Sequence, residues 1–176
     1  MTEPIPPAAA PDTIDTVAGL REGDAVATLR RTRDKVLLHT RLSEAALFDT
    51  ALPDLSLVER LHAARYVAQR SNAHALAATY RARLIDAGGM QDDIARADAD
   101  AFDALPRRLG ALLAHARRLT LSPADARPSD LDELKSAGFT TPAIVALSQL
   151  VAFVSYQLRV AAAAQALQAR AAREAA

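Results

Sequence analysis

Apolar residues recur every three or four positions along most of this 176-residue chain, which is the spacing of one face of an α-helix. The pattern is clearest in region 55–89, LSLVERLHAARYVAQRSNAHALAATYRARLIDAGG. Ser56 followed by Glu59 has the spacing of a capping box, and the apolar stripe behind it continues to about Arg70. This region therefore begins with a predicted helix.

A second helix is predicted directly after a short break in the same region. The break reads RSNAH, and Ser71 or Asn72 is expected to cap the helix that follows. This helix carries Leu76 and Tyr80 on its apolar face and ends at the glycine pair 88–89. Two helices are therefore expected to meet at residues 71–74.

Similar patterns predict helices on both sides of this central pair. Their starts and stops are marked by capping residues, prolines and glycines: a helix after Asp24, one over Asp34–Asp49, a short polar helix or turn in Gln91–Ala104, one after Pro106, a brief one from Ser129 to Gly138, and a long one over 142–174. Because the shortest of these segments can be turns, six or seven helices and no strands are expected. The fold class is therefore all-α.

The final helix is apolar on nearly every side from Pro142 to Val154. This run is interrupted by two polar residues and is too short to span a bilayer before Arg159, so a buried helix is expected. A helix without a polar face in a small domain needs neighbours on both sides. We therefore expect part of it to lie in a subunit interface of a homo-oligomer: a dimer, trimer or hexamer.

Composition narrows the possible functions. Lys plus Arg and Asp plus Glu are equal at 21 each, so no net charge favours nucleic acid or an acidic membrane, and neither is expected as a partner. The chain has no cysteine, which excludes thiol chemistry, disulfides and cysteine-bound zinc within it. The first residues do not have the pattern of a signal peptide, so a cytoplasmic location is expected.

The chain is long enough for one domain with a full core. Residues 1–12, with four prolines and a run of alanines, are expected to form a flexible arm, and residues 13–176 a single helical domain. The basic patch between Arg30 and Arg33 is interpreted as a solvated helix face.

Two segments resemble the carboxymuconolactone decarboxylase and alkylhydroperoxidase D (AhpD-like) superfamily. In region 55–89, Glu59 matches the glutamate of the E-x11-C-x-x-C-x-x-x-H motif of its redox-active members, while Ser71, His74 and Ala78 occupy the positions of the two cysteines and the final histidine. Late in the chain, AFVSYQLR is similar to the superfamily's AFFNYxNR segment. With its N-terminal extension, the chain resembles the longer, peroxidase-related branch of the superfamily.

The resemblance implies the AhpD-like helical fold but not the peroxidase reaction. In the redox-active members it implies a thiolate at a helix N-terminus that attacks the peroxide and then forms a disulfide. Ser71 cannot do this, because its hydroxyl stays protonated without an adjacent base and has no disulfide chemistry. Thiol peroxidase activity is therefore not expected.

Two functions stay open from the sequence. The first is a cofactor-free decarboxylase, lyase or isomerase acting on a small organic acid, with catalytic Glu59, His62 and His74. In this hypothesis the substrate is bound by Arg65, Ser71 and Tyr80, and neither a metal nor a cofactor is required.

The second function is that of a non-catalytic structural or binding member of the superfamily. Each candidate residue also has a structural interpretation: Glu59 can complete the capping box, His62 can be an ordinary helix residue, and Ser71 can be a helix cap. A cavity lined by Glu59, His62 and His74 would favour the enzyme. A junction filled by alanines and Tyr80 would favour the binding member.

Overall fold

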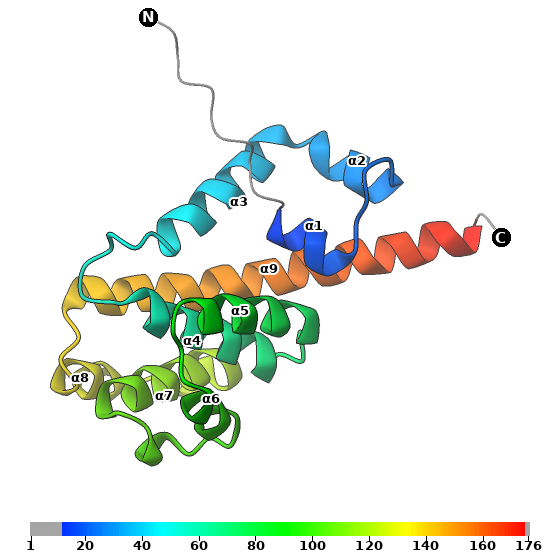
Figure 1. Ribbon diagram of the computed structural model, residues 1–176. Coiled ribbons are helices and arrows are strands. Elements are labelled where there is room, and N and C mark those ends of the chain that lie inside the picture. The colour runs from blue at the N-terminus through cyan, green and yellow to red at the C-terminus, as the bar shows by residue number, and fades with distance from the viewer. Residues whose placement is uncertain (1–11, 175–176) are drawn as a thin grey trace, which may run out of the picture.

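The computed structural model describes residues 12–174, and every regular element in this range is helical (Figure 1). The all-α class is confirmed, with more helices than the pattern predicted. The elements are α1 (Thr13–Ala18), α2 (Ala25–Arg31), α3 (Asp34–Leu47), α4 (Leu57–Arg70), α5 (His74–Asp86), α6 (Gln91–Asp98), α7 (Arg107–Leu121), α8 (Pro128–Ser136) and α9 (Thr141–Glu174), with short 3₁₀ turns η1 (Phe102–Ala104) and η2 (Pro123–Asp125).

Helix α4 lies at the centre of the molecule and packs against α5, α7 and α9. The nine consecutive residues from Arg60 to Ala68 are all buried. The predicted capping box starts this helix: Glu59 N donates to Ser56 Oγ (3.2 Å), and Ser56 N donates to Glu59 Oε2 (2.8 Å). Because α4 is covered on all sides, its polar side chains must find partners inside the protein.

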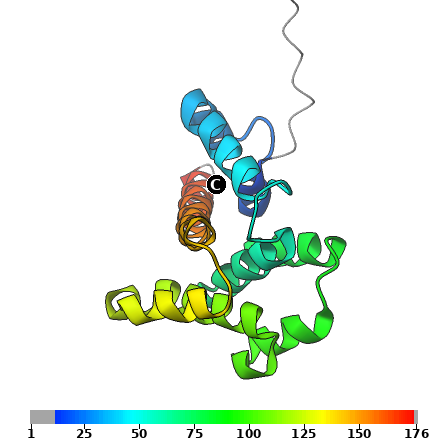
Figure 2. The ribbon, with the colours of Figure 1, turned by 90° about the vertical axis from the view of Figure 1, so that its left-hand side faces the viewer.

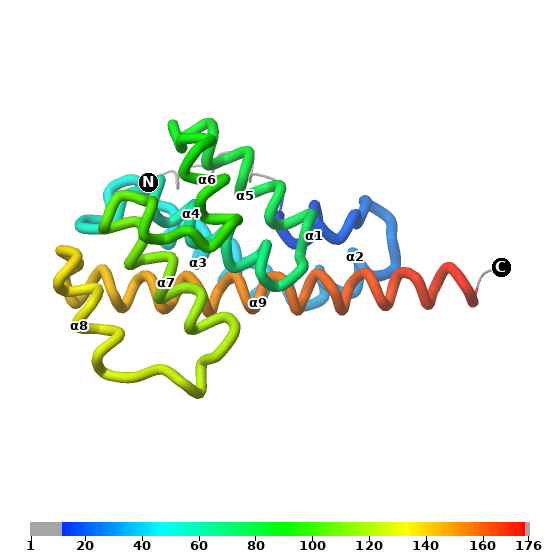
Figure 3. Tube along the Cα trace, turned by 90° about the horizontal axis from the view of Figure 1, so that it is seen from below, coloured from blue at the N-terminus to red at the C-terminus, as the bar shows by residue number. Residues whose placement is uncertain are grey.

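Helix α9 is a spine of 34 residues that runs the length of the molecule (Figure 3). One side of it is buried through a stripe that includes Leu147, Leu150, Val154 and Ala161. Its other side is open at Val145 and Tyr156. This helix is long and apolar enough to cross a membrane, a criterion that a core helix of a soluble protein also satisfies.

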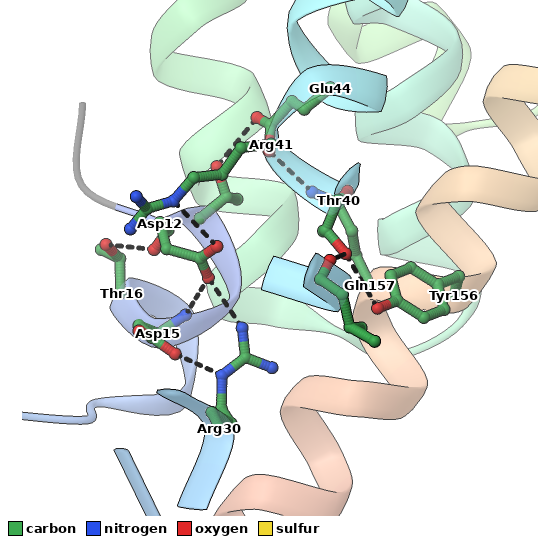
Figure 4. A network of polar contacts seen from close by, with 11 residues as sticks. Asp12, Asp15, Thr16, Arg30, Thr40, Arg41, Glu44, Tyr156 and Gln157 are labelled. Carbon is green, nitrogen blue, oxygen red and sulfur yellow. Dashed lines mark hydrogen bonds and ion pairs between the residues drawn. The ribbon is translucent and has the colours of Figure 1, made fainter. Parts of the chain in front are cut away.

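The N-terminal helices α1–α3 and the pair α7–α8 lie on opposite sides of α9, as the view along this helix shows (Figure 2). Asp12 caps α1 by accepting from Asp15 N (2.9 Å), and it also accepts from Arg30 Nη2 (3.0 Å), which joins α1 to α2 (Figure 4). Asp12 is buried. Asp12 therefore does not belong to the expected arm, residues 1–12, and residues 1–11 lie outside the described residues. Arg30 is part of this network and not of a solvated face.

A second polar network links α3, α5 and α9. The buried Tyr80 hydroxyl donates to Gln157 Oε1 (2.5 Å), and Gln157 Nε2 donates to Glu44 Oε2 (3.1 Å). Glu44 also accepts from Arg83 Nη1 (2.9 Å) and from the Thr13 hydroxyl of α1 (2.8 Å). These bonds connect the N-terminal helices to the core, because the backbones of α3 and α9 come close at few positions.

Several predicted boundaries hold, and some predicted caps are wrong. Helix α3 starts at Asp34 as expected and ends two residues before the predicted Asp49. Ser71 and Asn72 do not cap α5, which begins at His74; Ser71 is the C-cap of α4, and Asn72 turns the chain with φ of 56°. The short helix α1 was not predicted, because only six residues carry its pattern.

We predict that Tyr80→Phe lowers the free energy of unfolding by about 1–3 kcal/mol, because it leaves the buried Gln157 carbonyl oxygen without its donor. Urea unfolding would measure this loss. The matched control is Tyr156→Phe: this side chain is 36% exposed and its hydroxyl lies 3.0 Å from that of Thr40, so the loss should stay below about 1 kcal/mol. Equal losses in the two variants would contradict the structural role of the Tyr80–Gln157 bond.

Candidate functional site

The junction of α4 and α5 contains a cavity of about 210 Å³. The chain leaves α4 at Ser71, reverses at Asn72 and enters α5 at His74, so these residues form its rim. Its other walls come from α1 and α9. The lining residues are Val17, Ser71, Asn72, Ala73, His74, Ala75, Leu76, Leu158, Ala161, Ala162 and Gln165.

The start of α5 determines the electrostatics of the cavity. None of the lining residues carries a carboxylate, and His74 lies at the rim. The first N–H groups of α5 have no partner within the helix, because the first intrahelical bond is donated by Ala77 N to Ala73 O (2.9 Å). The N-terminal end of the helix dipole also points here. A small anion is therefore the ligand that this cavity favours.

Glu59 lies far from this cavity. It sits in the first turn of α4, twelve residues before Ser71, which at 1.5 Å per residue is about 18 Å along the helix. Both of its carboxylate oxygens are engaged: Oε2 accepts from Ser56 N, and Oε1 accepts from Arg108 Nε (2.6 Å). The surroundings of Glu59 are therefore those of a helix cap.

Arg108 is an anchoring residue that the sequence did not reveal. Besides Glu59, it donates to the backbone oxygen of Gly138 (2.6 Å) and to that of Asp54, and its guanidinium stacks 3.8 Å from the centroid of the Phe139 ring. These contacts join the start of α4 to α7 and to the turn before α9. Glu59 completes this anchor.

His62 and Arg65 lie together on the side of α4 that faces α6. His62 is 1% exposed, and its Nδ1 has no hydrogen-bond partner within residues 12–174. Burial lowers the pKa of His62, the Arg65 charge lowers this pKa further, and Asp93 of α6 raises it. Arg65 Nη2 donates to Asp98 Oδ1 (2.7 Å). Arg65 is thus engaged by a carboxylate of its own chain.

Tyr80 lies in the core and makes the bond to Gln157 described above. Burial raises the pKa of the Tyr80 hydroxyl well above its usual range. Of the six predicted site residues, the structure brings Ser71 and His74 together at the junction cavity. It places His62 beside Arg65 on the side of α4 that faces α6. Glu59 and Tyr80 each stand apart from both groups. Catalytic roles for these residues stay a prediction.

The arrangement of helices is shared with a known structure. The crystal structure of an uncharacterized peroxidase-related protein from Silicibacter sp. TM1040 superposes with a TM-score of 0.66 and 19% sequence identity, covering 93% of this chain and 92% of that chain. This likeness shows that the chain has the AhpD-like fold of the peroxidase-related proteins, as the sequence resemblance implied.

Sequence comparison does not identify an activity for this chain. No protein-family model matches the chain, and no curated protein matches its sequence. The chain therefore shares the fold of this peroxidase-related protein and has no cysteine.

We predict that Glu59→Ala lowers the free energy of unfolding by about 1–2 kcal/mol, because it removes the capping box and leaves Arg108 without its carboxylate. Urea unfolding measures the loss, and Glu22→Ala in the exposed turn after α1 is the control. If Glu59→Ala were as stable as the wild type, the carboxylate would not have the structural role that its contacts indicate.

We predict that stability falls as the pH drops from 7.5 to 5.5. The unfolded chain binds protons on its histidines near pH 6.5, whereas the folded chain resists protonation because burial lowers the pKa of both His62 and His115. The loss therefore begins as the pH falls through the unfolded pKa and stops growing below the lower folded pKa. Urea unfolding across this range should give a shallower slope for His62→Gln than for the wild type; an unchanged slope would contradict a neutral buried His62.

Proposed function

We propose that this protein is a non-catalytic binding member of the AhpD-like proteins, without thiol peroxidase activity, and that its junction cavity holds a small organic acid. The observation that carries the proposal is the lining of the cavity: Ser71 and His74 lie at its rim with no carboxylate among the lining residues, while the carboxylate of Glu59, needed for acid–base work, lies at the other end of α4.

The separation of the candidate residues argues against the enzyme hypothesis in its original form. General acid–base catalysis needs groups within hydrogen-bond reach of the same substrate atom or joined through one water. Glu59 lies about 18 Å from Ser71 along α4 and is held by Arg108, so it cannot orient His74. His62 is enclosed between α4 and α6, away from the cavity.

The size and chemistry of the cavity support a small carboxylate as the ligand. A volume of about 210 Å³ is below the usual range for drug-sized ligands and suits a compact molecule. Leu158 and Ala161 supply an apolar wall, while Ser71 and His74 supply polar contacts at the rim. An acid with a short hydrocarbon body would place its carboxylate at the start of α5.

A homo-oligomer in the cytoplasm is also part of the proposal. The open side of α9 at Val145 and Tyr156 supports a subunit interface on this helix. Neither nucleic acid nor a membrane is proposed as a partner, and both exclusions stay predictions from the balanced charge.

A decarboxylase or related lyase is the second candidate, and His74 at the cavity favours it. A single imidazole beside bound acid could move a proton without help from Glu59. In that case His74→Ala would abolish the consumption of the acid, measured by its loss from solution, while calorimetry would still detect weakened binding of the acid. If the wild type does not consume the bound acid, the decarboxylase is excluded and the binding role remains.

We predict that at least one small mono- or dicarboxylic acid binds the protein, measured by calorimetry, and that Ala162→Phe weakens this binding by about tenfold or more. Ala162 lines the cavity from α9, so a phenyl ring there occupies the ligand volume. The matched control is Ala166→Phe, one turn further along the same helix and also exposed, which should bind like the wild type.

Three results would contradict the proposed function. They are the failure of every acid to bind, unchanged binding by Ala162→Phe, and reduction of a peroxide by the pure protein with a thiol as electron donor. The last would also contradict the chemistry of a chain without cysteine.

A further inference from the structure

Gln165 is a polar residue on an otherwise apolar wall of the junction cavity. Among the residues of range 12–174 that line the cavity, those contributed by α1 and α9 are Val17, Leu158, Ala161, Ala162 and Gln165. A few polar groups on mainly apolar walls fix the orientation of a bound ligand and determine which ligand is accepted. The hydrogen bonds open to Gln165 therefore bear on the class of ligand.

The side-chain amide of Gln165 has a defined orientation. Its Nε2 donates to the backbone oxygen of Val17 (3.1 Å). Because a carbonyl oxygen can only accept a hydrogen bond, the nitrogen of the amide points at Val17 and the amide oxygen points away from it. Within residues 12–174 Oε1 makes no hydrogen bond, so it remains free to accept one from a ligand.

The donors of the cavity lie at the start of α5. The first N–H groups of this helix have no partner within it, and Ser71 and His74 stand at the rim. In the proposed function these groups hold the carboxylate of the acid. A ligand that also uses Gln165 therefore carries a hydrogen-bond donor on its body, in addition to the carboxylate.

A hydroxyl group suits this acceptor better than an ammonium group. An ammonium group brings a full positive charge into the cavity, and none of the lining residues carries a carboxylate to balance it. The N-terminal end of the α5 dipole also disfavours a cation nearby. A hydroxyl group donates a hydrogen bond to a carbonyl oxygen without adding charge.

We propose that the ligand of the junction cavity is a hydroxy acid and that Gln165 Oε1 accepts the hydrogen bond of its hydroxyl group. The inference rests on the proposed function, because it names the class of acid that the cavity holds. Gln165 thereby sets specificity: an acid without the hydroxyl group forgoes this bond and binds less tightly.

Matched acids that differ in one group test the ligand class. The probes are propionate, lactate and alanine, together with butyrate and its β- and γ-hydroxy and β- and γ-amino derivatives, which place the donor at increasing distance from the carboxylate. Calorimetry with the full chain should show that at least one hydroxy acid binds about threefold to tenfold more tightly than its unsubstituted counterpart. The amino counterpart should bind no more tightly than the unsubstituted acid.

The variant Gln165→Met tests the residue. A methionine keeps the length of the side chain but its sulfur is only a weak acceptor, so the ratio of the affinities for the hydroxy acid and the unsubstituted acid should fall to about one. The control is Gln168→Met. Gln168 Nε2 donates to Asp24 Oδ2 (3.0 Å) further along α9, outside the lining of the cavity, so this variant should keep the wild-type ratio.

Each ratio compares two ligands on the same protein, so a change in stability that is common to both ligands cancels. Circular dichroism confirms that each variant remains helical. A preference for the hydroxy acid that Gln165→Met retains would overturn the role of Gln165, and so would its loss in Gln168→Met.

The outcomes separate this inference from the proposed function. Equal binding of the hydroxy acids and their unsubstituted counterparts would overturn the hydroxy acid and leave the small-acid site in place. Tightest binding by an amino acid would overturn the hydroxyl group as the donor. If none of these acids binds, both the proposed function and this inference are overturned.

Discussion

The complete burial of helix α4 is the constraint on which the rest of the structure depends. Nine consecutive residues of this helix are covered by its neighbours, and three of them, Arg60, His62 and Arg65, are basic. Burial of a charge without a partner costs several kcal/mol, so the surrounding elements must supply partners. Arg60 Nη1 donates a hydrogen bond to Leu47 O (2.7 Å), and Arg65 Nη2 donates one to Asp98 Oδ1. The positions of the end of α3 and of α6 thereby follow from the polar residues of α4.

The burial of α4 also separates the residues that hold the fold from the residues that line the junction cavity. The residues in and before the middle of the helix hold the fold, and its C-terminal end meets α5 at the junction cavity. Ser71 and His74 line this cavity, so their substitution leaves the hydrogen bonds of Arg65 and Glu59 in place. Loss of Glu59, in contrast, disturbs the anchor that Arg108 builds.

Local signals in the sequence revealed much of the fold and little of the site. The capping box at Ser56 and Glu59 and the long apolar run of α9 depend on neighbouring residues, so local patterns find them. The partners of Arg65 and Glu59 lie 33 and 49 residues away, and no local pattern specifies them. Gln157 is an intermediate case: it falls on the buried stripe of α9 with Val154 and Ala161, which signals a buried amide, but its partner Tyr80 is 77 residues distant.

Apolar periodicity predicts that a face is buried and does not say against what. In α4 the periodic residues pack within the same chain, whereas in α3 Leu38 and Leu42 face solvent. The difference arises because the polar bonds of Glu44 hold α3 to α5 and α9 through its opposite side, which turns Leu38 and Leu42 outward. Rotation of the helix to bury these leucines would break the bonds of Glu44 and leave Gln157 without one of its partners. The buried network thus sets the direction in which α3 faces.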